Sequence, residues 1–293
     1  MDTRALENLI AIAEQGNISR AAEQIQLTQS ALSQCLAKEE REIGMPLFLR
    51  AERRLVPTDA GRLYLTCARE MVGIKAETYR KIRQLELGRT CLRIVSVEQF
   101  IGVVEQRLLP ELSKRFPALE YELTCISSYL ARQYLYNGLA DIAFLCMQQT
   151  ESSLLRCHPL YTDHACLVVP HALLTEEILR EGLPACGDLP FILPRRSSIM
   201  RAIIDQVLRE ARITVLQPRE VDGISSVIEQ VKKGLGAAFL PSRMCDESVY
   251  HMFKAETNSS RYSVVCAVPN YTSPSPERDA LYEIAVNHFT EDM

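Results

Sequence analysis

A short predicted helix carries four polar side chains on one face, where they could contact the edges of nucleic-acid bases. They are Gln29, Ser30, Ser33 and Gln34. A glutamine amide can make two hydrogen bonds to adenine, and a serine hydroxyl can contact either kind of base, so this face suits the major groove of DNA. An ordinary solvated helix carries the same residue types, so this face taken alone is better explained as ordinary surface than as a DNA contact.

Two shorter helices precede this face and would position it. Apolar residues at helical spacing predict a first helix that Gly16 ends, and Ser19 is expected to cap the second. Thr28 then caps the third helix, which runs from Gln29 to about Ile43. Helices joined by so short a turn must cross steeply, which predicts a helix-turn-helix motif whose last helix enters the groove.

A small hairpin is predicted next, because two apolar runs flank a charged turn between Met45 and Thr58. Arg50, Arg53 and Arg54 would concentrate positive charge at its tip, where a wing could meet DNA phosphates. The same arginines would also be expected in an ordinary solvent-exposed turn that makes no contact with DNA.

A long helix follows the hairpin. Thr58 and Asp59 can cap a helix that runs to about Leu85, and at 1.5 Å per residue it would span roughly 40 Å. Its apolar positions are Leu63, Val72, Tyr79, Ile82 and Leu85. A helix this long and exposed needs a partner to bury such a stripe, so we expect dimerisation through it.

Short apolar strands alternate with helices along the remaining two hundred residues. Strands are expected at 91–96, 120–125, 141–145, 165–170, 191–193 and 262–268, and the helices between them include 199–211 and 224–233. This alternation predicts βαβ units and two α/β lobes.

Composition excludes several classes of protein. The 293 residues are 47% hydrophobic and 24% charged, as in ordinary globular proteins of about two domains. The net charge of -4 excludes a globally basic DNA coater, although residues 1–90 carry 14 basic against 12 acidic side chains. No apolar stretch is long enough for a membrane helix and no signal peptide is seen, so we expect a cytoplasmic protein without membrane partners.

Four ordered segments of the N-terminal part resemble the LysR-type family of bacterial transcriptional regulators. The segments are Ile12–Ala22, Thr28–Ser33, Glu42–Phe48 and Thr58–Gly61. The resemblance implies an all-α winged helix-turn-helix domain over residues 1–58, a linker and dimerisation helix over 59–87 and an α/β effector-binding domain over 88–293. The effector domain is expected to resemble periplasmic binding proteins, with lobe I about 91–161 and 267–293 and lobe II about 162–266.

The resemblance also implies which residues contact double-stranded DNA. Gln29, Ser30, Ser33 and Gln34 would read bases, and Ser19, Arg20, Thr28, Lys38, Arg50, Arg53, Arg54 and Thr58 would complete the contact surface. Two positions depart from the family: Ser30 stands where proline is usual, and Gln34 where arginine is common. Because arginine is the commonest reader of guanine, we expect a preference away from guanine and a shallow salt dependence.

The ends of the predicted strands carry polar residues at the positions where this family contacts effectors. They are Ser96, Glu98, Gln99, Ser127, Ser128, Arg195, Arg196, Ser197, Ser198, Gly223, Ile224 and Ser225. Adjacent arginines beside capping serines favour a carboxylate ligand. Glu98 could instead pair with an arginine or receive the amino group of an amino-acid-like ligand, and each serine alone is explained by helix capping.

Other functions find less support in the sequence. No zinc, nucleotide or hydrolase motif occurs, so we expect neither an enzyme nor a cofactor. Two alternatives stay open: a redox-sensing regulator of the same family that switches through a cysteine such as Cys186, and a ligand-binding protein without DNA function. The favoured hypothesis is a transcriptional regulator that binds a pseudo-palindromic operator as a dimer and responds to a small-molecule effector. As in the rest of the family, two dimers are expected to form a tetramer, and an activator would also contact RNA polymerase.

Overall fold

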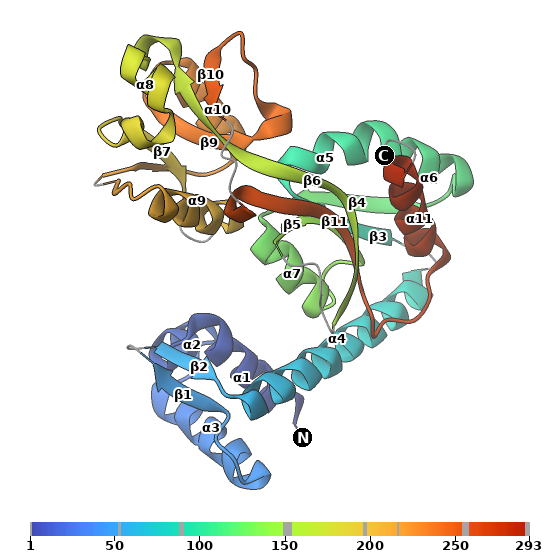
Figure 1. Cartoon of the computed structure of the whole chain (residues 1–293). Coiled ribbons are helices and arrows are strands. Elements are labelled where there is room, and N and C mark those ends of the chain that lie inside the picture. Colours follow the sequence, from blue (N-terminus) through green and yellow to red (C-terminus); the bar gives the residue numbers. More distant parts are fainter. Residues whose placement is uncertain are drawn as a thin grey trace.

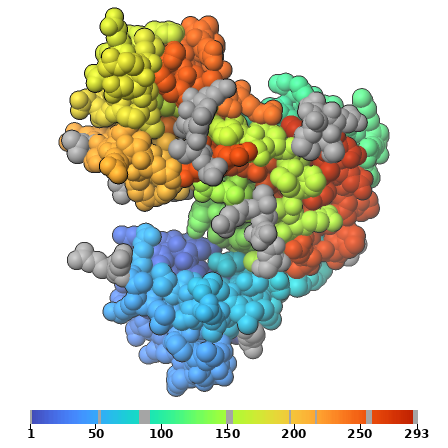
Figure 2. All heavy atoms as spheres, viewed as in Figure 1, coloured from blue at the N-terminus to red at the C-terminus, as the bar shows by residue number. Residues whose placement is uncertain are grey.

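The computed structural model describes residues 2–51, 54–87, 91–148, 154–195, 198–215, 217–253 and 258–290. It has three parts, which follow one another along the chain: a small N-terminal domain, one long helix and a two-lobed α/β domain (Figure 1). Figure 2 shows lobe II, in yellow and orange, as a mass set apart from the blue N-terminal domain, whereas the green and red lobe I lies against the long helix.

The N-terminal domain is a helix-turn-helix with a two-stranded wing. Its elements are α1 (Thr3–Gln15), α2 (Ile18–Gln24), α3 (Gln29–Ile43), β1 (Phe48–Ala51) and β2 (Arg54–Pro57). Leu6, Leu9 and Leu32 are fully buried where the three helices meet. Gly16 ends α1 in the left-handed conformation, as predicted, but Asn17 rather than Ser19 caps α2, because its side chain accepts a hydrogen bond from the Arg20 N–H.

The long helix α4 (Asp59–Leu87) is joined to both neighbouring parts by close backbone contacts. Thr58 caps it by accepting from the Gly61 N–H at 2.9 Å, and Gly61 lies directly against the Leu47 carbonyl. Further along, Gly73 packs against the ring of Tyr271, whose hydroxyl donates to the Leu135 carbonyl at 2.7 Å. Lobe I is therefore fixed to the middle of α4.

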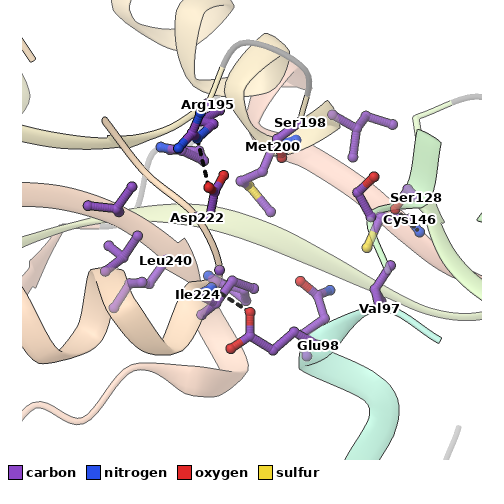
Figure 3. A pocket seen from close by; sticks show the side chains of 18 of the residues that line it. Val97, Glu98, Ser128, Cys146, Arg195, Ser198, Met200, Asp222, Ile224 and Leu240 are labelled. Carbon is purple, nitrogen blue, oxygen red and sulfur yellow. Dashed lines mark hydrogen bonds and ion pairs between the residues drawn. The ribbon is translucent and has the colours of Figure 1, made fainter. Parts of the chain in front are cut away.

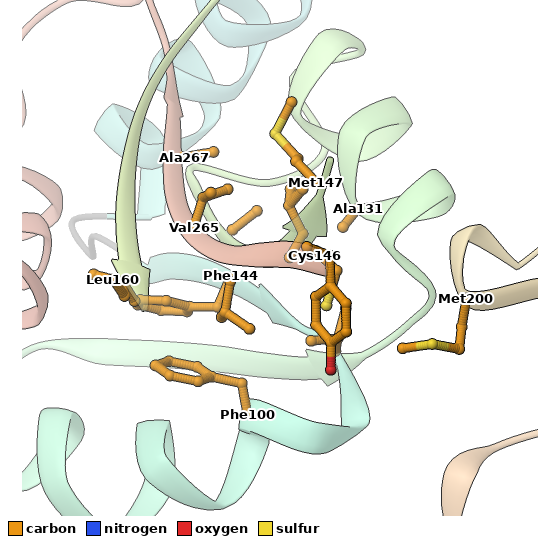
Figure 4. Close-up of a cluster of buried hydrophobic side chains, with 14 of the residues drawn as sticks. Phe100, Ala131, Phe144, Cys146, Met147, Leu160, Met200, Val265 and Ala267 are labelled. Atoms are coloured by element: carbon orange, nitrogen blue, oxygen red, sulfur yellow. The ribbon is translucent and has the colours of Figure 1, made fainter. Parts of the chain in front are cut away.

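Lobe I is one half of a mixed sheet, with strand order β4-β3-β5-β11-β6. Its strands are β3 (Cys91–Ser96), β4 (Glu120–Cys125), β5 (Ile142–Met147), β11 (Arg261–Pro269) and the first part of β6 (Leu155–Pro170). Its helices are α5 (Glu98–Val103), the π-helical turn Val104–Leu108, α6 (Leu109–Arg115), α7 (Ser128–Tyr136) and α11 (Pro276–Thr290). The rings of Phe100 and Phe144 stack in its core, with their centroids 5.2 Å apart (Figure 4).

Lobe II continues the sheet in the order β6-β9-β7-β8, with β10 also paired to β6. Its strands are β7 (Phe191–Pro194), β8 (Arg219–Val221), β9 (Ala237–Pro241) and β10 (Tyr250–Phe253). Its helices are α8 (Glu176–Glu181), α9 (Ile199–Glu210) and α10 (Ile224–Lys232). The buried Arg201 of α9 binds the Pro194 carbonyl at 2.9 Å and Glu220 at 2.9 Å, so it fixes the ends of β7 and β8.

Two strands connect the lobes. β6 pairs with β11 as far as His164 and with β9 from Ala165 onward, and Arg261 begins β11 opposite His164. At this crossing the buried Asp163 accepts hydrogen bonds from the hydroxyls of Tyr262 and Ser242. The lobes thus meet at a hydrogen-bonded hinge.

Candidate DNA-binding and effector sites

The outer face of α3 presents the polar residues that the sequence singles out as base readers. Gln29, Ser30 and Gln34 are exposed and Ser33 is half-buried, while Leu32 and Leu36 face the core. Thr28 caps α3 through a hydrogen bond from the Ala31 N–H at 3.2 Å. The helix is therefore fixed at its N-terminal end and free of intramolecular cover on the side that would meet a groove.

The other predicted DNA-contact residues lie on α2, on α3, on the wing and at the start of α4. Ser19 and Arg20 lie exposed on α2, Lys38 on α3, and Arg50 and Arg54 on the wing strands. Arg53 lies outside the described residues. Thr58 has a structural role in addition, because its hydroxyl donates to the Pro46 carbonyl at 2.8 Å while it caps α4.

A cavity of about 330 Å³ lies between the two lobes (Figure 3). Lobe I contributes the start of α5, the end of β4 and the start of α7; lobe II contributes the end of β7, the starts of α9 and α10, and β9. Such a volume is at the lower end of the range for small-molecule sites, about 300–1,000 Å³.

The helices α7, α9 and α10 begin at the lining of this cavity, as the short helix α5 does. Ser127 caps α7 by accepting from the Leu130 N–H, and Ser198 caps α9 by accepting from the Met200 N–H. The third helix, α10, begins after Gly223, which has no side chain to act as a cap. Helix N-termini carry partial positive charge, so this arrangement favours an anionic group in the cavity.

The charged residues of the cavity are already paired within the protein. Arg195 and Asp222 form an ion pair at 2.7 Å, with both side chains largely exposed. Glu98, at the start of α5, accepts a hydrogen bond from the Ile224 N–H across the gap between the lobes (Figure 3). It also accepts one from the Ser225 N–H. A charged ligand must therefore compete with these internal partners.

The structure brings together most of the predicted effector residues. Glu98, Gln99, Ser127, Ser128, Arg195, Ser198, Gly223 and Ile224 line the cavity. Two predicted residues do not: Ser96 is fully buried in β3, where its hydroxyl donates to the Val97 carbonyl, and the exposed Ser225 is not part of the lining, although its N–H binds Glu98. Ser96 ends a central strand that is covered on both faces, which explains its burial. Arg196 and Ser197 lie outside the described residues.

The apolar part of the lining and one of its charges were not predicted from the sequence. Ile126, Met200, Val227 and Leu240 contribute the apolar surface, and Asp222 stands beside Arg195. These residues are close in the sequence to the predicted polar strand ends, and that proximity could have indicated them as lining residues. A small-molecule pocket needs apolar walls around a few polar groups.

The redox alternative requires Cys186 to lie in an exposed loop, but the structure buries it. Its thiol is fully buried in the 3₁₀ turn Leu183–Cys186 and donates to the Gly182 carbonyl at 3.4 Å. Burial raises the pKa of this thiol to about 11, so the reactive thiolate is scarce at neutral pH.

The outer side of α4 carries apolar side chains that this chain leaves uncovered. Leu63, Met71, Ile74 and Ile82 are exposed and recur at a spacing that places them on one face of the helix; we call them the α4 stripe. The predicted Val72 instead packs inward against α1, and the side chain of Leu85 lies outside the described residues.

Among the described residues, no three metal-ligating side chains gather, and no helix is long and apolar enough to cross a membrane.

Two family models cover nearly the whole chain. The model of the bacterial regulatory helix-turn-helix protein, lysR family, matches residues 3–62, and that of the LysR substrate binding domain matches residues 86–289. A probable RuBisCO transcriptional regulator of Trichormus variabilis is 31% identical over 80% of this chain and 72% of its own length. An uncharacterized HTH-type transcriptional regulator of Bacillus subtilis, YxjO, is 29% identical over 83% of this chain and 81% of its own.

Solved structures show the same fold. Full-length BenM, 18% identical, matches with a TM-score of 0.56 over 100% of this chain and 98% of its own. A full-length OxyR variant from Pseudomonas aeruginosa, also 18% identical, matches with a TM-score of 0.51 over 99% and 94%. The family is one of transcriptional regulators rather than enzymes. This chain belongs to the LysR-type family, with an N-terminal DNA-binding helix-turn-helix and a C-terminal effector-binding domain.

Proposed function

We propose that this protein is a transcriptional regulator that binds a pseudo-palindromic operator as a dimer and responds to a small molecule held between its lobes. The observation that carries the proposal is the interlobe cavity, because residues from both lobes line it and a ligand there would favour one lobe arrangement over another. The α4 stripe supplies the dimer contact, and two α3 helices would then enter successive major grooves.

The proposal extends to the assembly and its surroundings. We propose that two dimers assemble into a tetramer and that the protein acts in the cytoplasm, where bacterial DNA lies. If it activates transcription, it would also contact RNA polymerase. The effector is its only small-molecule ligand, with no cofactor besides. The burial of Cys186 argues against a switch through this thiol.

The replacement Gln34→Ala tests α3 as the reader of DNA sequence. Gln34 is exposed on the outer face of α3, and a two-hydrogen-bond contact to a base contributes about 1–3 kcal/mol, so operator affinity should fall roughly 5- to 150-fold. Affinity for unrelated DNA should stay unchanged, because that binding depends on phosphate contacts. Fluorescence anisotropy with both duplexes measures the two affinities. An equal loss on both duplexes would remove Gln34 from the base readers.

The effector is proposed to be a small anionic or amino-acid-like metabolite with an apolar body. The three helix N-termini and Arg195 suit a carboxylate, and Met200, Val227 and Leu240 suit an apolar group. The carboxylates of Glu98 and Asp222 suit an ammonium group once it displaces their present partners.

Thermal unfolding of the full chain against a panel of carboxylates and amino acids tests this site. A ligand present at 100 times its dissociation constant should stabilise the protein by about 2.7 kcal/mol. Arg195→Ala should reduce the shift, whereas Arg180→Ala should preserve it, because Arg180 forms a similar exposed ion pair with Glu181 on α8, away from the cavity. A shift that stays as large in Arg195→Ala as in the wild type would place the ligand elsewhere.

A further inference from the structure

Helix α10 differs from α7 and α9, which also begin at the cavity. α7 and α9 each begin with a serine that accepts a hydrogen bond from their own first turn, whereas α10 begins with Gly223. The first N–H groups of a helix have no partner within the helix, so another group must satisfy them. In α10 this group comes from the other lobe.

Glu98 of lobe I supplies that partner. Its Oε2 accepts from the Ile224 N–H at 2.6 Å and its Oε1 accepts from the Ser225 N–H at 2.9 Å. A carboxylate at a helix N-terminus gains from both the charge-assisted hydrogen bonds and the helix dipole. Burial would raise the pKa of Glu98, but the hydrogen bonds from Ser225 and Ile224 outweigh it, and the pKa lies below its usual value. Glu98 is thus held in its charged form.

The backbone of lobe II is shaped to admit this side chain. Gly223 has a φ of +80°, a conformation that side-chain-bearing residues rarely adopt, and a Cβ built on it would lie 3.0 Å from Glu98 Oε2. Glycine at this position therefore both starts α10 in the observed direction and leaves space for the carboxylate.

We propose that Glu98 is an intramolecular ligand of lobe II, which closes the cleft in the absence of effector and must leave α10 before a carboxylate of the effector can bind there. This inference rests on the proposed function, because it assigns a competitor to the same site. The two N–H groups cannot serve two carboxylates at once, and two carboxylates at such short range repel each other. Release of Glu98 thus couples effector binding to the contact that joins the lobes.

Replacement of Glu98 and rescue by acetate test this inference in the full chain without DNA or effector. In Glu98→Ala, hydrogen exchange at the amides of Ile224 and Ser225 should become at least about tenfold faster, because a charge-assisted hydrogen bond is lost at each. Sodium acetate should restore protection in this variant, since the free anion can occupy the vacated position, while sodium chloride at equal ionic strength should not. The wild-type protein should respond to neither salt.

Two variants make the interpretation specific. Glu111→Ala, an exposed carboxylate on α6 of the same lobe, should leave exchange at α10 unchanged. Glu98→Gln keeps the size of the side chain without its charge, and it should give an intermediate exchange rate and weaker rescue. Unchanged exchange in Glu98→Ala, or equal acetate protection of the wild type and the variant, would overturn the inference. Because DNA and effector are absent from this experiment, its failure would be distinct from failure of the proposed function.

Discussion

Replacing Ile74 by aspartate should break the proposed dimer contact along α4, and operator affinity should fall by at least about 100-fold. That factor is the lower end of the affinity gained when two binding modules are joined. Ile74 is 48% exposed at the centre of the α4 stripe, where a second copy would cover it. Burial of an unpaired carboxylate in that contact is strongly unfavourable, so the two helices would separate. Sedimentation velocity measures the assembly, and fluorescence anisotropy with the full operator measures the affinity.

The matched control is Leu179→Asp on α8 of lobe II. Leu179 is 52% exposed, so the same change at similar exposure, outside the α4 stripe, should leave both sedimentation and operator affinity unaltered. If Ile74→Asp also sediments as the wild-type assembly does, the α4 stripe is not the dimer contact, and another surface must join the subunits.

Gly61→Ala should destabilise the DNA-binding domain by about 3–5 kcal/mol, the range of severe single substitutions. A Cβ on Gly61 would overlap the Leu47 carbonyl oxygen, far inside contact distance. Relaxation is limited, because that oxygen also accepts the Thr58 N–H at 3.0 Å, which ties the start of the wing to the start of α4. Thermal and denaturant unfolding followed by circular dichroism measure the loss.

Gly102→Ala provides the comparison for this prediction. A Cβ on Gly102, near the end of α5, would meet nothing within 4 Å, and alanine favours a helix over glycine by up to about 1 kcal/mol. This variant should therefore be as stable as the wild type or slightly more stable. If Gly61→Ala is as stable as Gly102→Ala, the close approach of Gly61 to Leu47 is relieved at little cost.

Features that depend on local sequence could be predicted well. Gly16 and Gly44 end their helices in the left-handed conformation, and Thr28 caps α3, because each needs only its own neighbours in the chain. The strand predicted at 91–96 is β3, and the helix predicted at 199–211 is α9 apart from its last residue. Apolar periodicity and capping residues are sufficient for elements of this kind.

Features that depend on distant parts of the chain could not be predicted. The sequence indicates Glu98 as a polar strand end, but its partners on α10 lie more than one hundred residues away. Glu39 is buried in the core of the N-terminal domain, where it accepts a hydrogen bond from the Tyr64 hydroxyl at 2.7 Å, a contact that depends on a residue of another helix. The first half of β6 was missed because its side chains alternate irregularly between exposed and buried as the strand passes from one lobe to the other.

That shared strand also restricts how the effector domain can evolve. β6, residues Leu155–Pro170, belongs to both halves of the sheet, and β11 returns beside it. Recombination between related genes cannot exchange one lobe alone without cutting a strand that both lobes need. Within one effector domain, new effector preferences are therefore expected to arise by substitutions at the strand and helix ends that line the cavity. The DNA-binding domain, by contrast, forms one continuous stretch of chain together with the first half of α4, whose side chains complete its core, and this stretch can be inherited as a unit.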